Sequence, residues 1–135
     1  MRIDQDYLKR LLEIAHGSRT PTFTIEDFER NNMPYDTDAF EFHMHILNDQ
    51  GLIVQDDGDA GFGMFKSADG SRTWSVLPLR LSASGHEFIE ALENAEVWAT
   101  IKRDFKDASI ETLKKVGLQL LNGYVARKVE KLLRD

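Results

Sequence analysis

The chain has 135 residues, of which 41% are hydrophobic and 30% are charged, and its formal net charge is −6 at pH 7. These values are ordinary for a single soluble globular domain. There is no cysteine, which excludes disulfides, thiolate metal sites and cysteine nucleophiles and suits a reducing compartment. The charged N-terminus and the lack of an apolar run long enough to cross a bilayer lead us to expect a cytoplasmic protein of bacterial type.

Charge is distributed unevenly along the sequence. Residues 26–60 contain ten acidic residues and one basic residue, and residues 82–100 contain four glutamates and no Lys or Arg. Residues 101–135 contain nine basic and five acidic residues. A protein that binds nucleic acid usually carries a basic surface. The candidates for such a surface are the C-terminal segment and residues 61–81.

Two helices are expected at the start of the chain. Apolar residues at helical spacing predict an amphipathic helix over residues 3–15. Thr24 and Asp27 have the spacing of a capping box, with Asp in place of the usual Glu or Gln. They predict that a short helix begins there and covers roughly residues 25–31.

A third helix is expected from residue 36 or 37 to about residue 50. Its apolar stripe contains Phe40, Met44 and Leu47. Gly51 suits the left-handed residue that follows many helices, and Leu52 would then contact Leu47.

The middle of the chain has the pattern of short strands. Residues 52–55 and 62–66 are predicted strands, and the Asp-Gly pair at 69–70 is typical of a hairpin turn. Residues 72–81 also resemble a strand. Pro78 cannot donate a hydrogen bond to a neighbouring strand, so it is expected at a strand end or at a sheet edge.

The remainder is predicted to be helical. Two apolar stripes lie between residues 88 and 105, and Asn94 either caps a second helix there or lies within a continuous one. A last helix, roughly 109–133, is expected to begin at a Ser109 cap.

The order of these elements is three helices, a β-hairpin or three short strands, and two or three further helices. The first part has the order of a winged helix-turn-helix module. We therefore predict a mainly α fold with a small β-hairpin wing. Residues 1–82 would form the winged-helix module, and residues 83–135 would form C-terminal helices that pack on it.

Two stretches carry a resemblance to known proteins. FHMHILNDQGLIV (residues 42–54) is followed by the expected hairpin and then by LRLSASGHEFIEALENAEVW (residues 79–98). This arrangement resembles winged-helix proteins in general. Many of them have a recognition helix that ends in Gly-Leu-Ile, then a wing, and then a helix that starts with Leu-Ser/Thr-x-x-Gly.

More narrowly, the chain resembles an uncharacterised family of bacterial and prophage proteins catalogued as a domain of unknown function. Members have a histidine at the position of His43 and a Leu-Thr-x-x-Gly-His-x-Phe motif, which residues 81–88 match with Ser in place of Thr. A Trp and a Lys follow, matching Trp98 and Lys102. The resemblance covers most of the chain, supplies no catalytic residues, and implies a role in phage-related gene control.

The candidate recognition helix departs from what a DNA-binding helix requires. It contains Asp38, Glu41 and Asp49 but no Lys or Arg. Carboxylates that face phosphates reduce affinity for DNA. The residues with side chains suited to nucleic acid are two possible base readers, His45 and Asn48.

Basic residues of the predicted hairpin segment are candidates for phosphate contacts. These are Lys66, Arg72 and Arg80. The alternative interpretation is that they are solvated charges on a hairpin, and the sequence does not favour either one.

A histidine–carboxylate cluster marks the start of the first C-terminal helix. His86, Glu87 and Glu90 resemble the HExxH zinc motif with its second histidine missing. A zinc site needs a third protein ligand, and none is evident. Ser84 and Glu87 have the spacing of a capping box, and Ser82 is a rival cap. We interpret the cluster as the beginning of a helix and predict no metal, cofactor or catalytic residue.

His43 and His45 are not expected to share a metal ion. Residues two apart on a helix point about 200° away from each other. One imidazole should therefore face the core and the other should face solvent.

The last helix carries apolar residues on more than one face. Such a helix needs packing partners on two sides, and symmetric dimers are the most common closed assembly. We therefore expect a homodimer formed through residues 95–133.

These patterns predict a non-enzymatic winged-helix protein that binds double-stranded DNA as a regulator of phage or prophage type. Residues 36–50 would approach the major groove, while the wing and the basic C-terminal segment would contact phosphates. The alternative is a winged-helix module that binds a basic protein through the acidic surface of residues 26–60.

Overall fold

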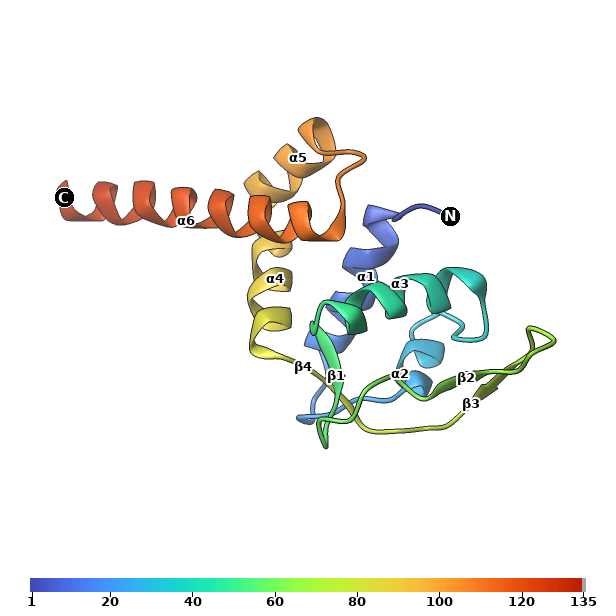
Figure 1. Cartoon of the computed structure of the whole chain (residues 1–135). Helices are drawn as coiled ribbons and strands as arrows, with labels where there is room; N and C mark the ends of the chain where they lie inside the picture. The colour runs from blue at the N-terminus through green and yellow to red at the C-terminus, as the bar shows by residue number, and fades with distance from the viewer. Residues whose placement is uncertain (135) are drawn as a thin grey trace. The chain divides into compact units, whose positions relative to one another are not determined.

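The computed structural model describes residues 1–134 (Figure 1). Within this range the chain is mixed α/β, with six helices, one two-stranded antiparallel sheet and a separate two-stranded hairpin. It divides into two compact units, of which the first ends at His86 and the second begins at Glu87. Among the described helices, none is both long enough and apolar enough to span a membrane.

The first unit begins with α1 (Gln5–His16), α2 (Ile25–Arg30) and α3 (Asp38–Asp49). The predicted capping box of α2 is confirmed. The Thr24 side chain accepts a backbone N–H of the first turn, and the Asp27 side chain accepts the backbone N–H of Thr24 at 2.8 Å. This reciprocal pair fixes where the chain turns into α2.

The end of α3 has the geometry that its sequence predicts. The Leu52 N–H donates to the Leu47 carbonyl at 2.8 Å, and the Gly51 N–H donates to the Asn48 carbonyl at 2.9 Å. Gly51 has a φ of +65°, which glycine adopts without strain. These are the two hydrogen bonds of a Schellman ending. At the other end, the Thr37 side chain caps the helix.

The small sheet pairs β1 (Ile53–Gln55) with β4 (Leu79–Leu81) in antiparallel register. On the other side of β4, Phe23 and Leu79 exchange two backbone hydrogen bonds of 2.9 and 2.8 Å. β4 therefore lies between β1 and the segment that precedes α2.

The separate hairpin consists of β2 (Met64–Lys66) and β3 (Arg72–Trp74). The strand expected over residues 72–81 is thus two strands, because the chain leaves one sheet after Trp74 and enters the other at Leu79. Pro78 lies at this break, where it needs no N–H. Its carbonyl accepts the Asp56 N–H at 3.0 Å, which closes the base of the excursion.

The core of the first unit draws on all three helices and both strands of the small sheet. Burying each large apolar side chain contributes about 1.5–3 kcal/mol before the entropy of ordering is counted. The largest fully buried side chains of this unit are Leu8, Leu11, Leu12, Ile25, Phe28, Phe40, Met44, Leu47, Leu52, Ile53 and Leu79.

The C-terminal helices are α4 (Ala83–Glu93), α5 (Ala95–Asp104) and α6 (Ile110–Arg134). Asn94 caps α5 by accepting the Val97 N–H at 3.1 Å, so α4 and α5 are separate helices. The predicted cap of α6 at residue 109 is confirmed by a side-chain contact to a backbone N–H of its first turn.

The histidine–carboxylate cluster lies on the exposed side of α4. His86, Glu87 and Glu90 are all exposed. The cap is Ser82, whose hydroxyl accepts the Gly85 N–H at 3.0 Å. Of the two caps suggested by the sequence, the structure therefore selects the earlier one.

Gly85 is required by a close approach of two backbones. A Cβ at this position would lie 2.2 Å from the Leu52 carbonyl oxygen. The start of α4 thus packs directly on the backbone that leaves α3, and no other residue type fits there without displacement.

We predict that Gly85→Ala lowers the free energy of unfolding by about 1–3 kcal/mol, because the methyl group forces the two backbones apart. Urea denaturation followed by circular dichroism measures the change. The matched control is Gly123→Ala within α6, where the nearest atom to a new Cβ is a flexible Arg127 nitrogen at 3.6 Å. That change should stabilise the helix by about 0.5–1 kcal/mol. Equal effects of the two substitutions would contradict the steric argument.

Candidate functional site

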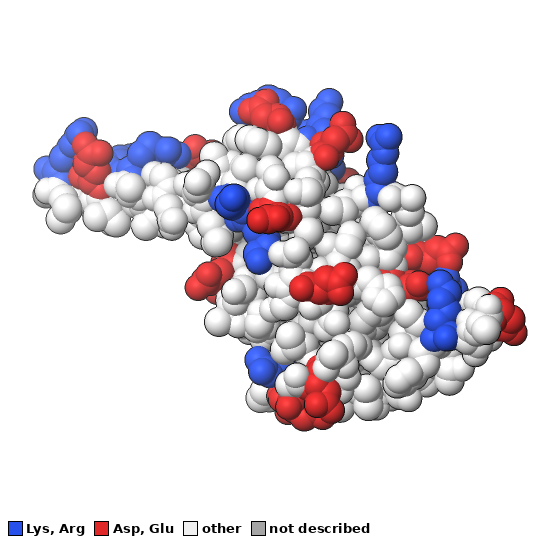
Figure 2. Space-filling view, viewed as in Figure 1, with Lys and Arg blue, Asp and Glu red and all other residues white. Residues whose placement is uncertain are grey.

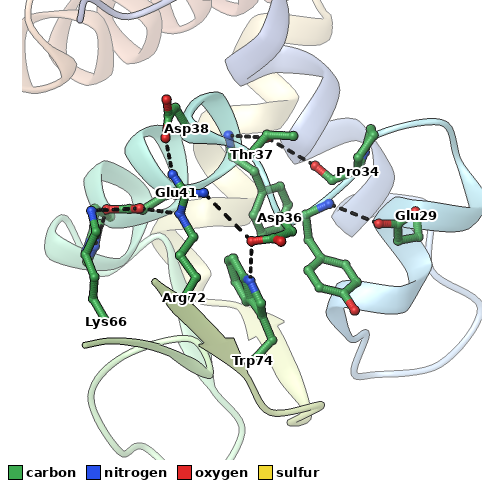
Figure 3. A network of polar contacts seen from close by, with 12 residues as sticks. Glu29, Pro34, Asp36, Thr37, Asp38, Glu41, Lys66, Arg72 and Trp74 are labelled. Atoms are coloured by element: carbon green, nitrogen blue, oxygen red, sulfur yellow. Dashed lines mark hydrogen bonds and ion pairs between the residues drawn. The ribbon is translucent and has the colours of Figure 1, made fainter. Parts of the chain in front are cut away.

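The surface that contains most of the predicted nucleic-acid contacts is built from α3 and the β2–β3 hairpin. Lys66 and Arg72 are opposite each other in the hairpin register. Both side chains reach α3, where the acidic residues of its first turns meet them (Figure 3).

Arg72 is held by three carboxylates. Its Nε donates to Oε1 of Glu41 at 2.6 Å, and its Nη2 donates to Asp38. Its Nη1 lies 3.8 Å from Oδ1 of Asp36. Only 17% of the Arg72 side chain is exposed. The guanidinium therefore directs its N–H donors to carboxylates of the same chain.

Glu41 is the acidic centre of the cluster. Its side chain is 15% exposed, and its second carboxylate oxygen accepts from Nζ of Lys66 at 2.9 Å. Hydrogen bonds from Arg72 and then from Lys66 lower the pKa of Glu41, and the Glu41 hydrogen bond raises the pKa of Arg72. With Asp36 and Asp38, three carboxylates face two cations, so the cluster keeps a net negative charge.

Trp74 fixes the hairpin against α3. Its indole Nε1 donates to Asp36 at 3.0 Å. Its ring packs at centroid distances of 5.1, 5.8 and 6.2 Å on Tyr35, Phe40 and Phe62. The cations of the hairpin are therefore positioned by a packed aromatic cluster beneath them.

Asn48 makes hydrogen bonds that hold two loops together. Its amide nitrogen donates to the carbonyls of Ile53 and Gly61 at 3.0 and 3.1 Å. Its amide oxygen accepts the Gly61 N–H at 3.2 Å. Both amide donors are thus occupied, which favours a structural role over the base contact predicted from the sequence.

His45 and Arg80 are both partly exposed, with 50% and 41% of their side chains accessible. The His45 ring packs edge-on against Phe62, with half of its side chain exposed. Arg80 lies on β4, in the other sheet, where its Nε is 3.5 Å from Oδ1 of Asp56. The structure therefore brings His45, Lys66 and Arg72 together and leaves Arg80 outside the cluster.

No broad area of positive charge covers this surface on the face shown in Figure 2. Blue side chains near the hairpin lie beside red ones. This is the pattern expected when acidic and basic residues pair with each other rather than with an external anion.

A groove of about 360 Å³ runs beside the cluster on the outer side of α3. Its apolar wall is formed by Met1, Phe42 and Ile46, and charged or polar residues surround that wall. The other lining residues are Asp38, Glu41, His45 and Lys66.

The two histidines of α3 point in different directions, as predicted. His43 is buried, and its Nδ1 lies 2.7 Å from the Ala39 carbonyl while its Nε2 accepts the Asp4 N–H at 3.0 Å. This pattern requires a neutral ring that carries its proton on Nδ1. Burial lowers the pKa of His43. This effect exceeds those of the hydrogen bond to Ala39 and of the Asp4 charge, which both raise the pKa.

No group of three His, Asp or Glu side chains is arranged to hold a metal ion among residues 1–134.

Comparison with known proteins finds one family whose model matches most of the chain. The model of a family described as hypothetical protein DUF2513 matches residues 2–111. That is most of the chain, and the chain therefore belongs to this family. The expected resemblance to a domain of unknown function is confirmed at this level. No curated protein and no solved structure matches the chain.

We predict that Glu41→Gln lowers the free energy of unfolding by about 1–2 kcal/mol, because it removes the charged partner of two cations from a mostly buried position. Chemical denaturation at pH 7 measures the loss. Asp38→Asn is the control on the same helix. The Asp38 side chain is 78% exposed, so its loss should have a much smaller effect. Similar losses for both variants would contradict the central role of Glu41.

We also predict that stability falls on acidification between about pH 7 and pH 5, because His43 takes up a proton more readily in the unfolded chain. A lowered pKa stabilises the folded chain at pH values above the pKa of the same group in the unfolded chain. This stabilisation is lost as the pH falls through the pKa of the group in the folded chain. The lowered pKa of Glu41 affects the stability of the fold only as the pH approaches and falls below the ordinary value of 4.5. His43→Gln should flatten the profile between pH 7 and 5. An unchanged slope in His43→Gln would refute this assignment.

Proposed function

We propose that the chain is a non-enzymatic winged-helix protein of phage or prophage type, whose α3–hairpin surface binds a basic protein partner. The order of elements supports the winged-helix part of this proposal. Three helices precede β1, the β2–β3 hairpin follows, and the chain returns in β4 between β1 and the Phe23 segment. In this description, α3 is the recognition helix and the hairpin is the wing.

The observation that carries the choice of partner is the pairing of Arg72 and Lys66 with Glu41. To contact a phosphate, these cations must leave a carboxylate that is 15% exposed. An uncompensated carboxylate in such a position is costly. The phosphate would also approach a cluster of net negative charge, which opposes the electrostatic term on which non-specific DNA binding depends.

The groove on α3 favours a partner that combines apolar and basic side chains. Phe42 and Ile46 offer an apolar wall, and Asp38, whose side chain is 78% exposed, offers an acidic site at its edge. An amphipathic helix with lysines or arginines beside its apolar stripe has the matching chemistry.

Duplex DNA is the second candidate partner, and the basic residues of the C-terminal segment favour it. The cytoplasmic location and the homodimer expected from the sequence belong to the same proposal.

A binding comparison tests this function. A designed helical peptide with leucines on one face and arginines beside them is titrated into ¹⁵N-labelled protein, in parallel with a random-sequence duplex DNA at low salt. We expect the peptide to shift the NMR signals of Phe42, His45 and Ile46, and we expect the DNA to leave them unchanged. Asp38→Asn should weaken the peptide complex by about twofold to fivefold, while Asp49→Asn, outside the groove on the same helix, should not.

The DNA interpretation makes the opposite predictions. DNA binding whose affinity falls linearly with the logarithm of salt concentration, and which weakens in Lys66→Ala and Arg72→Ala, would overturn the protein-binding proposal.

A further inference from the structure

The apolar side chains of the distal half of α6 are exposed, and this half contacts α5 through the pairing of Arg127 with Glu96. Leu113 and Gly117 are buried in its first half, where a Cβ on Gly117 would touch Ala91 at 3.6 Å. From Val125 to Arg134 every residue is exposed, and α6 extends beyond α4 and α5 (Figure 1). Its large exposed apolar side chains are Val125, Val129, Leu132 and Leu133.

These side chains belong to a regular seam. Leu118, Asn122, Val125, Val129 and Leu132 follow one another at intervals of four, three, four and three residues. On a helix with 3.6 residues per turn, they lie within an arc of about 80°. Intervals that alternate between four and three are the a and d positions of a coiled coil, with Asn122 and Val129 at a.

Charge is excluded from this seam, although α6 is rich in cations. Arg127, Lys131 and Arg134 lie more than about 100° around the helix from the centre of the seam, and Lys128 lies about 80° from it, at its flank. Figure 2 shows blue side chains along one edge of α6 and uncharged ones along the other. Arg127 is moreover paired with Glu96 of α5 at 2.7 Å.

We propose that residues 118–132 of α6 form a parallel two-stranded coiled coil with the same residues of a second copy of this chain. This inference rests on the homodimer of the proposed function and makes it specific, but it is independent of what α3 binds.

The position of Asn122 and the charge distribution favour a second copy over other occupants. A buried amide needs a hydrogen-bonding partner, and in a parallel pair Asn122 meets its own equivalent. A purely apolar partner would leave it unpaired. An anionic lipid surface or an acidic partner would attract cations, but three of the four in this segment point away from a surface that covers the seam, and only Lys128 flanks it.

The size of the seam sets the strength of the dimer. Fifteen residues of helix are about 22 Å long, and with a helix diameter of about 10 Å each seam offers roughly 220 Å². Stable interfaces bury about 1,200–2,000 Å² in total. The coiled coil alone should therefore give a weak dimer that forms in the micromolar range or above, with an apparent mass that rises with protein concentration.

The absence of cysteine from the chain allows a direct test by disulfide trapping. Full-length Asn122→Cys and Val129→Cys are oxidised separately, since each a position faces itself in a parallel pair. We expect both to form disulfide-linked dimers at least tenfold faster than Lys131→Cys, an exposed position on the opposite face. Trapping of only one seam position would overturn the parallel orientation, and trapping no faster than the control would overturn the interface.

Sedimentation provides the second measurement. We expect Val125→Asp to remain monomeric at concentrations where the wild type associates, with unchanged helix content by circular dichroism. A wild type that stays monomeric up to about 1 mM, or a Val125→Asp variant that dimerises normally, would refute the proposal. Binding of the full-length wild type to phosphatidylserine vesicles, lost in Val125→Asp, would assign the seam to lipid instead.

The same variant separates this inference from the proposed function. If Val125→Asp is monomeric and still binds the basic peptide at the α3 groove, the coiled coil is supported without reference to the partner of α3. If the peptide does not bind at the α3 groove but both seam cysteines still form disulfide-linked dimers, the proposed function is overturned and the coiled coil is not.

Discussion

Arg72 provides the contact on which the α3–hairpin surface depends. A hairpin of two three-residue strands buries little by itself, and isolated two-stranded hairpins are marginal in water. Here the guanidinium joins β3 to Glu41 and Asp38 of α3, and Trp74, two residues further along β3, adds an aromatic anchor. Charge pairing at the rim and aromatic packing beneath it therefore hold the same two elements in register.

This arrangement changes what the acidic character of α3 means. In the sequence, its carboxylates suggest a helix that repels DNA or an acidic surface that attracts a basic protein. In the structure, Asp38 and Glu41 neutralise the hairpin cations that would otherwise attract phosphates. The charges of the helix and of the hairpin therefore cannot be considered separately, because each set neutralises the other. The free surface that remains is the groove beside Phe42 and Ile46, where apolar contact rather than charge dominates.

Local structure could be predicted from the sequence because its signals are local. The Thr24 capping box, the ending at Gly51 and the cap of α6 each depend on residues within one helical turn. The partners of Arg72 and Asn48 lie between 5 and 36 residues away, and no spacing rule identifies them. The split of residues 72–81 into strands of two different sheets was missed for the same reason, since it depends on pairing with distant segments.

The hydrogen bond between Asp56 and Pro78 marks the point where residues 57–77, which include the β2–β3 hairpin, leave the small sheet and return to it. Because Phe62 and Trp74 pack on the core within this excursion, only the turn between β2 and β3, residues 67–71, is free to change in length. Doubling a flexible loop costs only about 0.6 kcal/mol in closure entropy. Related chains can therefore carry longer or shorter turns at this point on an unchanged scaffold, whereas a change at Arg72 or Trp74 alters both the surface and the stability of the fold.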